Sequence, residues 1–259
     1  MKTSKSSFID SLSHPTMFDL NGSSLVEEYQ RKGFKGALAV PLRSEFHSAH
    51  DLYRYFSASL KTRFFLPVWP YTNREDSADQ VDKAVSEGCC AIKIHPRSLE
   101  WNWTTADGVA RLEELFEAAC GTLPLMFCTY FPHRAGFWPQ SDPLIIFDRL
   151  LKKFPEAKVV LLHGGATRLL EYLEFARFIE NILIDLSYSV TRYRFSSIFA
   201  DFQFAYQNFD QRICFGSDYP YLPLSDAVDT MIESASGTKL EGSVLEVCSN
   251  NLEQFLFSK

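Results

Sequence analysis

Eight short apolar runs alternate along this chain with amphipathic segments, and no other feature constrains its fold as strongly. The runs are rich in Val, Ile, Leu and Phe, which is typical of strands buried on both faces of a parallel sheet. They cover residues 8–14, 36–42, 64–70, 90–96, 124–131, 158–165, 181–187 and 212–220. Segments between them, such as 106–122 and 142–157, have apolar residues at helical spacing after polar starts.

This alternation predicts an α/β fold, a closed (β/α)₈ TIM barrel, because that fold typically needs about 250 residues and the chain has 259. An open doubly wound sheet is the alternative, but no Gly-rich phosphate-binding turn follows the first run. We expect a single domain over residues 1–259, with a helix at residues 242–256 packed under the barrel.

The composition argues against several classes of protein. A formal net charge of −6, a pI near 5.6 and the lack of a Lys/Arg run argue against a nucleic-acid surface. No stretch approaches the roughly 20 apolar residues that cross a bilayer, and residues 1–10 lack the apolar core of a secretory signal. Six cysteines without paired spacing fit a reducing cytoplasm. We expect a cytoplasmic protein with no nucleic-acid or membrane partner, and the sequence leaves a homo-oligomer open.

Chemically reactive side chains stand at the carboxyl ends of the predicted strands. In chain order they are Asp10, His14, Trp69, Lys93, His95, Arg97, Cys128, Tyr130, His163, Ser187 and Asp218. Because catalytic groups of a TIM barrel come from the ends of different strands, we expect them to converge on one mouth. His14, Cys128, His163 and Asp218 carry imidazole, thiolate and carboxylate groups, which are all good Zn²⁺ ligands. The alternatives are structural: Asp218 as a turn residue and Cys128 as a small buried one.

Cationic and aromatic side chains gather in the segments that follow the strands. The predicted substrate-binding residues are Lys93, His95, Arg97, Tyr130, Arg134 and Arg192. On a protein of net negative charge, a cationic mouth favours a small anionic substrate, because Arg binds carboxylate or phosphate through two parallel hydrogen bonds. Solvated surface charge is the alternative explanation.

The strand ends also carry a resemblance to a known family. The segments FIDSLSHP, AIKIHPR, PLMFCTYF, VVLLHGG, NILIDLS and RICFGSDYP, with the terminal NNLEQFL, resemble the amidohydrolase-related barrels. This branch of the amidohydrolase superfamily includes aminocarboxymuconate-semialdehyde decarboxylase and pyrone-dicarboxylate lactonase. The resemblance covers nearly the whole chain, and it implies metal-facing positions at His14, His163 and Asp218.

Two positions depart from the family pattern. The strand-one motif of the family is Asp-x-His-x-His, and Asp10, Leu12 and His14 occupy its frame, so leucine replaces the first histidine. At strand five, Cys128 stands where the family usually has histidine before threonine. The resemblance therefore implies one divalent metal, with zinc the candidate and Cys128 a substitute ligand. The departures leave open whether the metal is bound or lost, and they argue against a two-metal site bridged by a carboxylated Lys93.

Three functions are compatible with these residues. The first is hydrolysis of a small carboxylate-bearing lactone, amide or ester, in which Asp218 takes the proton from water while His163 holds the metal or the oxyanion and His14 completes the site. The second is nonoxidative decarboxylation of an unsaturated or aromatic acid. The third is a catalytically reduced barrel that binds a small molecule. In each case we expect the Asp218 carboxylate to face the open mouth.

Overall fold

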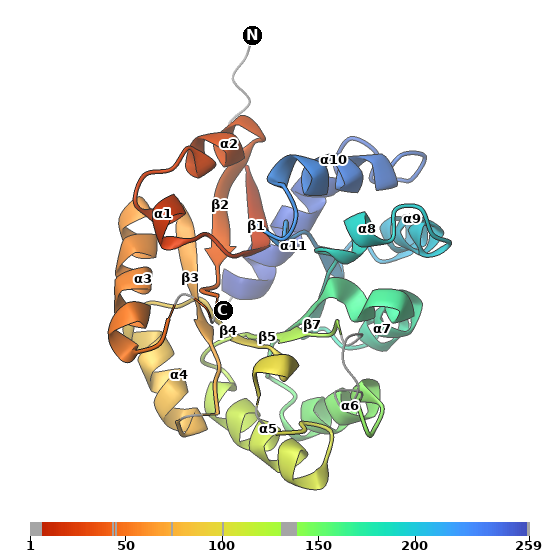
Figure 1. Ribbon diagram of the computed structural model, residues 1–259. Helices are drawn as coiled ribbons and strands as arrows, with labels where there is room; N and C mark the ends of the chain where they lie inside the picture. Colours follow the sequence, from red (N-terminus) through yellow and green to blue (C-terminus); the bar gives the residue numbers. More distant parts are fainter. Residues whose placement is uncertain are drawn as a thin grey trace.

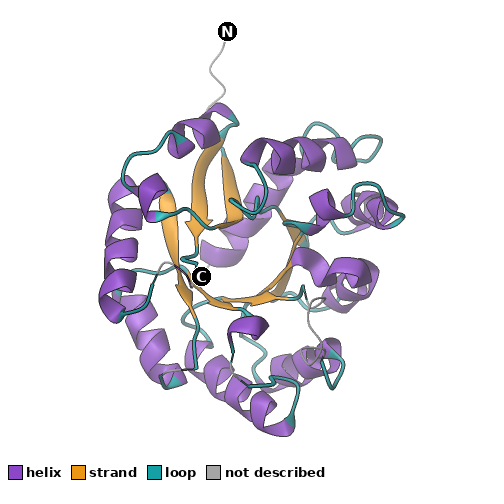
Figure 2. Cartoon of the chain, in the orientation of Figure 1, coloured by secondary structure: helices purple, strands orange, loops and turns teal. Residues whose placement is uncertain are grey.

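Eight parallel strands form a barrel surrounded by a ring of helices (Figure 1, Figure 2). The structure, a computed structural model, describes residues 7–42, 44, 46–73, 75–99, 101–130 and 139–257. The strands are β1 (Phe8–Ser13), β2 (Phe34–Ala39), β3 (Phe65–Pro70), β4 (Ala91–Ile94), β5 (Leu125–Cys128), β6 (Val159–Leu162), β7 (Ile182–Asp185) and β8 (Ile213–Cys214). They are hydrogen-bonded in chain order from β1 to β8, which confirms the predicted TIM barrel.

The observed strands lie in the predicted apolar runs, with two differences. Strand β2 begins at Phe34, before the predicted start at residue 36, and it ends at Ala39. Strand β8 contains only Ile213 and Cys214. After Cys214 the chain turns toward β1, so the rest of the predicted run forms the connection that carries Asp218 instead of regular strand.

Side-chain caps set the start of several helices in the outer ring. Ser48, Asp76, Thr105 and Asp142 each accept a hydrogen bond from a backbone N–H group in the first turn of the helix that follows, which satisfies donors that the helix itself leaves unpaired. The helices are α1 (Met17–Leu20), α2 (Leu25–Arg31), α3 (Ala49–Thr62), α4 (Ser77–Ser86), α5 (Ala106–Ala119), α6 (Pro143–Lys153), α7 (Leu169–Ala176), α8 (Ser189–Arg192), α9 (Ile198–Asn208), α10 (Leu224–Ser234) and α11 (Val244–Phe257). Two 3₁₀ turns, η2 (Pro96–Ser98) and η3 (His163–Arg168), directly follow β4 and β6.

The predicted terminal helix is observed as α11, and it packs against the barrel interior. Interior-facing side chains of the strands form a small apolar cluster that includes Ile9 and Met126, and Leu252 of α11 belongs to the same cluster. The backbone N–H of Ile9 donates to Ser249 Oγ at 2.8 Å, which fixes α11 against the start of β1. Helix α11 therefore covers the amino-terminal end of the strands, and their carboxyl ends are left for the site (Figure 1).

Backbone hydrogen bonds close the seam between the first and last strands. The N–H of Asp218 donates to the carbonyl of Leu12 at 2.9 Å, and the N–H of His14 donates to the carbonyl of Tyr219 at 2.7 Å. These bonds lie beyond the two residues of β8, where the chain pairs with the end of β1. The seam thus fixes the position of Asp218 relative to that of His14.

The buried carboxylate of Asp10 strengthens the same seam. It accepts hydrogen bonds from the backbone N–H groups of Leu12 and Ser217, both at 2.9 Å, and from the hydroxyl of Tyr29 at 2.7 Å. Burial raises the pKa of Asp10 to about 7, although the hydrogen bonds from Ser217, Tyr29 and Leu12 oppose that shift. Asp10 therefore joins β1, α2 and the segment after β8, which is a structural role.

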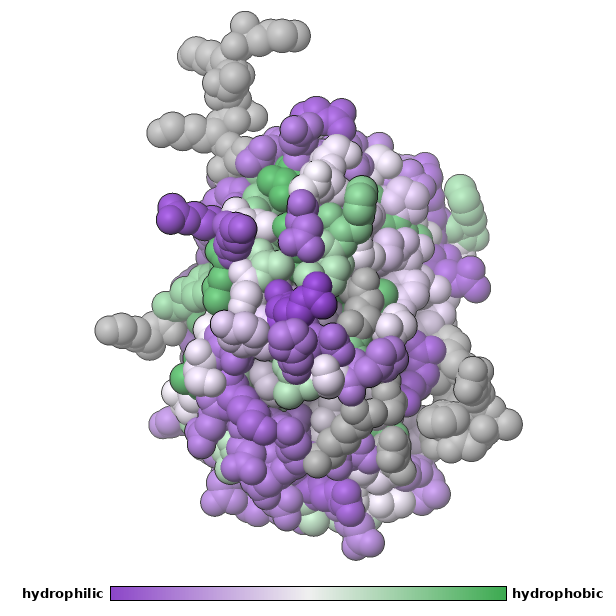
Figure 3. All heavy atoms as spheres, turned by 60° about the vertical axis from the view of Figure 1, so that its left-hand side comes forward, coloured by the Kyte–Doolittle hydropathy of each residue, from purple (hydrophilic) through white to green (hydrophobic). Residues whose placement is uncertain are grey.

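The outer surface is mixed in character. Hydrophilic residues dominate the lower part of the face shown in Figure 3, and hydrophobic residues gather in its upper part.

Among the described residues, no helix combines the length and the apolar character that a membrane crossing requires. Formation of a homo-oligomer stays a prediction.

The Asp10 carboxylate yields a test of the seam. Asp10→Ala should lower the free energy of unfolding by about 1 to 3 kcal/mol for each buried donor that loses its partner. Urea denaturation of parent and variant measures the change. Asp229→Ala is the control, because Asp229 is exposed and pairs with the partly exposed Lys32 at 2.9 Å, so its loss should cost no more than about 1 kcal/mol. Equal losses in the two variants would show that Asp10 does not hold the seam.

Candidate active site

Five of the predicted residues come together at the carboxyl ends of the strands. They are His14, Lys93, Cys128, His163 and Asp218, and each is buried. They are joined by short contacts or by the charges they exert on one another. The expectation that residues distant in sequence gather at the carboxyl ends of the strands is confirmed for these five, and His14 and Lys93 among them line the open cavity.

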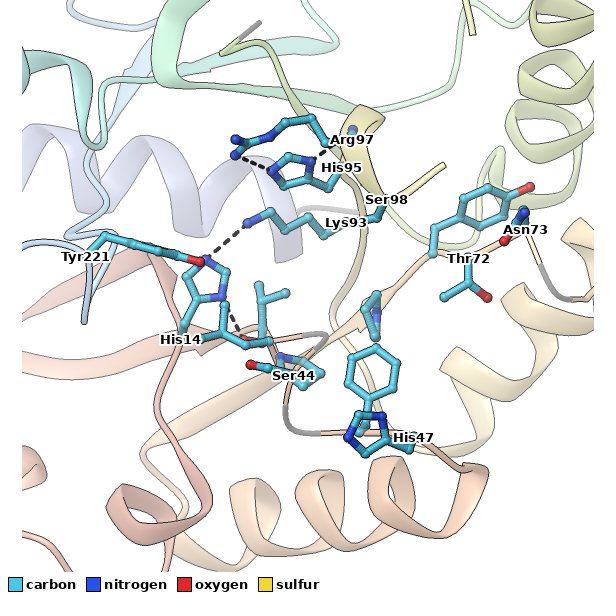
Figure 4. A pocket seen from close by; sticks show the side chains of 16 residues that line it. His14, Ser44, His47, Thr72, Asn73, Lys93, His95, Arg97, Ser98 and Tyr221 are labelled. Carbon is cyan, nitrogen blue, oxygen red and sulfur yellow. Dashed lines mark hydrogen bonds between the residues drawn. The ribbon is translucent and has the colours of Figure 1, made fainter. Parts of the chain in front are cut away.

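A cavity of about 620 Å³ opens over the ends of β1 to β4 (Figure 4). Its lining includes His14, Lys93, His95 and Arg97 among the predicted residues, together with Tyr221 from the segment after β8. No Asp or Glu belongs to the described lining, so the side chains that face the cavity are neutral or cationic. A cavity of this size and charge suits a small anion.

The ring of His14 is held in one orientation. Its Nδ1 lies 2.8 Å from the carbonyl oxygen of Val40, which can only accept, so Nδ1 carries the hydrogen. Burial, followed by the charge of Lys93, lowers the pKa of His14, which favours the neutral ring. Nε2 is then an acceptor, and it lies 3.2 Å from Lys93 Nζ (Figure 4). The ring edge of Tyr221 covers the other side, with ring centroids 5.9 Å apart.

Asp218 lies behind His14, which corrects the expectation that its carboxylate faces the open mouth. The residue is 7% exposed, it is absent from the cavity lining, and its Oδ1 is 3.5 Å from His14 Nε2. The reason is the turn after β8, where Asp218 adopts a left-handed φ of 55° that directs the side chain toward β1. Burial alone would raise the pKa of Asp218, but the contact with His14 and the charges of His163 and Lys93 outweigh it and lower the pKa. The carboxylate is therefore ionised.

Lys93 projects from β4 toward His14 and is only 6% exposed. Burial lowers its pKa, whereas the negative charges of Asp218, Cys128 and Asp185 act in the opposite direction. Lys93 is thus a buried amine that lines the cavity at the centre of the site.

Cys128 and His163 form a second pair. Burial raises the pKa of the Cys128 thiol, but the charges of His95 and His163 and their hydrogen bonds outweigh it and place the pKa well below its usual value. Burial lowers the pKa of His163, yet the charge and hydrogen bond of Cys128 raise it to about 9. His163 Nδ1 lies 3.1 Å from the carbonyl oxygen of Ser187, which orients the ring. An imidazolium next to a cysteine favours the thiolate form.

The backbone at these strand ends is strained. His163, Tyr188 and Asp218 have backbone φ values of 66°, 59° and 55°. Residues other than glycine rarely adopt this left-handed region. Such residues cost free energy and concentrate at functional sites. In η3, Gly165 has a φ of 72°, and a Cβ atom there would lie 2.2 Å from the ring of Tyr172. Only glycine fits this turn, which positions the backbone after His163.

Sequence reasoning missed several residues that shape the site. Asp185 is fully buried, accepts from the side chains of Ser11 and Ser187, and lies 3.3 Å from the backbone nitrogen of His163. The signal was present, because Asp185 interrupts the apolar run at residues 181–187. The carbonyl of Val40 leaves no such signal, since any residue supplies one.

Three predicted substrate-binding residues are not part of the described cavity lining. Tyr130 packs its ring edge against His163 and Tyr188, with centroid separations of 6.1 and 5.0 Å. Arg192, in the last turn of α8, is exposed, and its charge lowers the pKa values of the two tyrosines against the larger effect of burial. Arg134 lies outside the described residues. Their roles stay predictions.

Comparisons with known proteins agree with the barrel fold. A family model described as amidohydrolase matches residues 27–235. The chain belongs to the amidohydrolase family. No curated protein sequence matches it.

Several solved structures are similar to this chain in fold. An uncharacterized TIM-barrel protein of Bordetella bronchiseptica has a TM-score of 0.72 and 19% identity, with 96% of this chain and 98% of that chain covered. A probable 2-pyrone-4,6-dicarboxylic acid hydrolase of Acinetobacter baumannii, with citric acid bound, has a TM-score of 0.62 and 13% identity over 96% and 99%. The 5-carboxyvanillate decarboxylase of Sphingomonas paucimobilis has a TM-score of 0.63 and 13% identity over 97% and 99%. At these identities the likeness is one of fold.

The predicted metal ligands of this amidohydrolase do not fit a metal ion. Within the part of the chain that the structure describes, no three His, Cys, Asp or Glu side chains are placed to hold one. Leu12 carries no donor atom and is fully buried, and His14 Nε2 faces Lys93 Nζ at 3.2 Å. The metal implied by the family resemblance therefore has no ligand cage here.

The Cys128 pair yields a spectroscopic prediction. Because its pKa lies well below the usual value, Cys128 should be a thiolate in the folded protein at neutral pH. It should become a thiol only when the solution is made acidic. In each of the other cysteines, burial is the largest influence on the thiol and raises its pKa. These residues are Cys89, Cys90, Cys120, Cys214 and Cys248. The ultraviolet absorbance of thiolate at neutral pH should therefore come from Cys128 alone.

The measurement compares parent and Cys128→Ser by difference absorbance during an acid titration. The parent should lose a thiolate signal that the variant never shows, and unfolding in denaturant at neutral pH should abolish the same signal. Cys248→Ser is the control and should retain it. A parent without thiolate absorbance at neutral pH would contradict the ion pair.

Proposed function

We propose that this amidohydrolase is an enzyme that hydrolyses a small carboxylate-bearing lactone, amide or ester. The observation that carries the proposal is the cavity lining, in which Lys93, Arg97 and His14 are present and no described residue is acidic. The ionised Asp218 lies directly behind His14, 3.5 Å from its Nε2. The cationic side chains that can bind a substrate carboxylate thus lie close to Asp218, which can accept a proton.

Arg97 is the anchor for the substrate carboxylate. It is exposed at the mouth, in η2, and its backbone N–H donates to His95 Nδ1 at 3.2 Å, which fixes the start of the turn. A guanidinium group binds a carboxylate through two parallel hydrogen bonds. The citric acid in the Acinetobacter baumannii structure is a carboxylate ligand in a barrel of the same fold, which agrees with this choice of substrate.

Asp218 and His14 provide the path for the proton. The low pKa of Asp218 keeps it ionised and able to accept. The ring of His14 lines the cavity next to Asp218, so the proton of an attacking water can pass to Asp218 beside that ring. The leaving group then takes the proton back.

Lys93 is placed to stabilise the oxyanion that forms when water attacks, because its side chain lines the cavity. His163, whose pKa is raised to about 9, lies directly after β6, outside the described lining, and adds positive charge near the site. Donors held in a dry site stabilise developing negative charge more strongly than water does. The roles of these two residues follow from their charge and place in the site.

Decarboxylation of an unsaturated or aromatic acid is the second candidate. The observation that favours it is the burial of Lys93 beside a cavity lined by cations, because a carboxylate next to Lys93 would lie within reach of the proton path. The two candidates differ in product: hydrolysis consumes water and yields an extra acid, whereas decarboxylation releases carbon dioxide. Assays that follow both products separate them.

Replacement of the proton acceptor provides the main test. Asp218→Asn keeps the volume of the side chain and removes its charge, so kcat should fall by roughly 10² to 10⁴. The assay measures turnover of a panel of small lactones, esters, amides and unsaturated acids by parent and variant.

The control for this test is Asp229→Asn, an exposed residue of α10 that pairs with Lys32, and it should leave kcat unchanged. If Asp218→Asn keeps the activity of the parent, Asp218 is structural and the mechanism is wrong. If the parent turns over no member of the panel, a binding barrel replaces the enzyme as the better account.

Replacement of the anchor tests the substrate class. Arg97→Ala should weaken binding of a carboxylate substrate by about 1.5 to 3 kcal/mol, measured as a rise in KM, because a charged hydrogen bond is lost. The amide of the same acid should bind poorly to both proteins. Arg177→Ala is the control, since Arg177 pairs with Glu174 on the surface. Equal binding of acid and amide by the parent would exclude an anion site.

A further inference from the structure

The ring of His14 is oriented as in a metal-binding histidine, but a lysine faces it. Metal-bound histidines usually donate the hydrogen of one ring nitrogen to a carbonyl or carboxylate and point the other nitrogen at the metal. His14 donates from Nδ1 to the carbonyl of Val40 at 2.8 Å, and Nε2 points into the site. The group that Nε2 meets is Lys93 Nζ, 3.2 Å away (Figure 4).

Lys93 occupies the space next to the free ring nitrogen of His14. Its Nζ lies 3.2 Å from His14 Nε2, and Asp218 Oδ1 lies 3.5 Å from the same nitrogen. A metal ion bound to His14 Nε2 would have to displace the Lys93 side chain, and it would stand beside a like charge in a buried site.

At the strand-one position where the family motif has its first histidine, this chain has a packed leucine. Leu12 is fully buried in the interior cluster of the barrel, and its Cβ approaches the backbone of Gly216 so closely that a Cβ added to Gly216 would lie 2.9 Å away. The lining of the barrel is therefore complete at this point, with a hydrocarbon in place of an imidazole.

We propose that the ammonium of Lys93 is the resident cation of this site, standing where the predicted ligands would otherwise hold a metal, and that it excludes the metal. The ammonium donates to the lone pair of His14 Nε2 and is attracted by the charge of Asp218. Its remaining hydrogens can then face the cavity that Lys93 lines. There it can donate to a carbonyl or carboxylate oxygen, which is the task a Lewis acid would perform. This catalytic role rests on the proposed function, whereas the exclusion of metal does not.

Zinc binding by parent and Lys93 variants tests the exclusion. Protein freed of metal by chelation is titrated with Zn²⁺ in a calorimeter, and metal retained after gel filtration is measured by elemental analysis. The parent should retain well below one equivalent. Lys93→Gln removes the charge at nearly the same length and should raise the zinc affinity by about tenfold or more, because repulsion by a like charge is lost and His14 Nε2 is released.

Two further variants identify the source of any gain. Lys93→Arg keeps the positive charge and should not gain zinc affinity. The double variant Lys93→Gln, His14→Ala should lose whatever Lys93→Gln gains, since His14 is then the ligand that the lysine had occupied. Circular dichroism and thermal melts verify that each protein is folded, and Lys93→Met serves as a second neutral variant if Lys93→Gln does not fold.

Either of two results would overturn the proposal. One is a parent that carries a full equivalent of zinc and loses it in His14→Ala. The other is a folded Lys93→Gln or Lys93→Met protein that binds zinc no better than the parent. None of these readouts requires a substrate, so an inert parent in the turnover assay would count against the proposed function and leave the exclusion of metal to be decided by zinc binding.

Discussion

The seam between the last and first strands is the constraint on which the site depends. His14 comes from one side of the seam and Asp218 from the other, and the backbone hydrogen bonds that join the two sides set their side chains 3.5 Å apart. Asp10 holds the same seam from inside with three hydrogen bonds, at the cost of burying a carboxylate. Closure of the barrel therefore also brings together the two side chains to which we assign the proton path.

The fold could be predicted from the sequence because each strand is a buried apolar run with turn residues behind it. The gathering of the site residues followed from the fold alone, since all strands of a parallel barrel end at the same edge. His163 and Cys128 belong to runs 158–165 and 124–131, and their pairing needed no information beyond the neighbouring places of β5 and β6.

The remaining features depend on distances that no pattern in the chain records. Asp218 is buried because a left-handed backbone at that residue turns its side chain inward, and aspartate tolerates this conformation without a sequence signal that requires it. The contact between Lys93 and His14 crosses from β4 to β1, and it depends on how far a flexible side chain reaches across the barrel mouth. Arg134, at the predicted mouth, lies outside the described residues.

The packing of α11 has a consequence for how the protein forms. The backbone N–H of Ile9 donates to Ser249 Oγ although 240 positions separate the two residues. Leu252 packs in the interior apolar cluster to which Ile9 also belongs. Contacts of such long range carry a high entropic cost of loop closure and slow the search for the native state. During synthesis, the amino-terminal end of the barrel stays open to water until residues 244–257 have left the ribosome, so a nascent chain exposes apolar strand faces for most of its elongation.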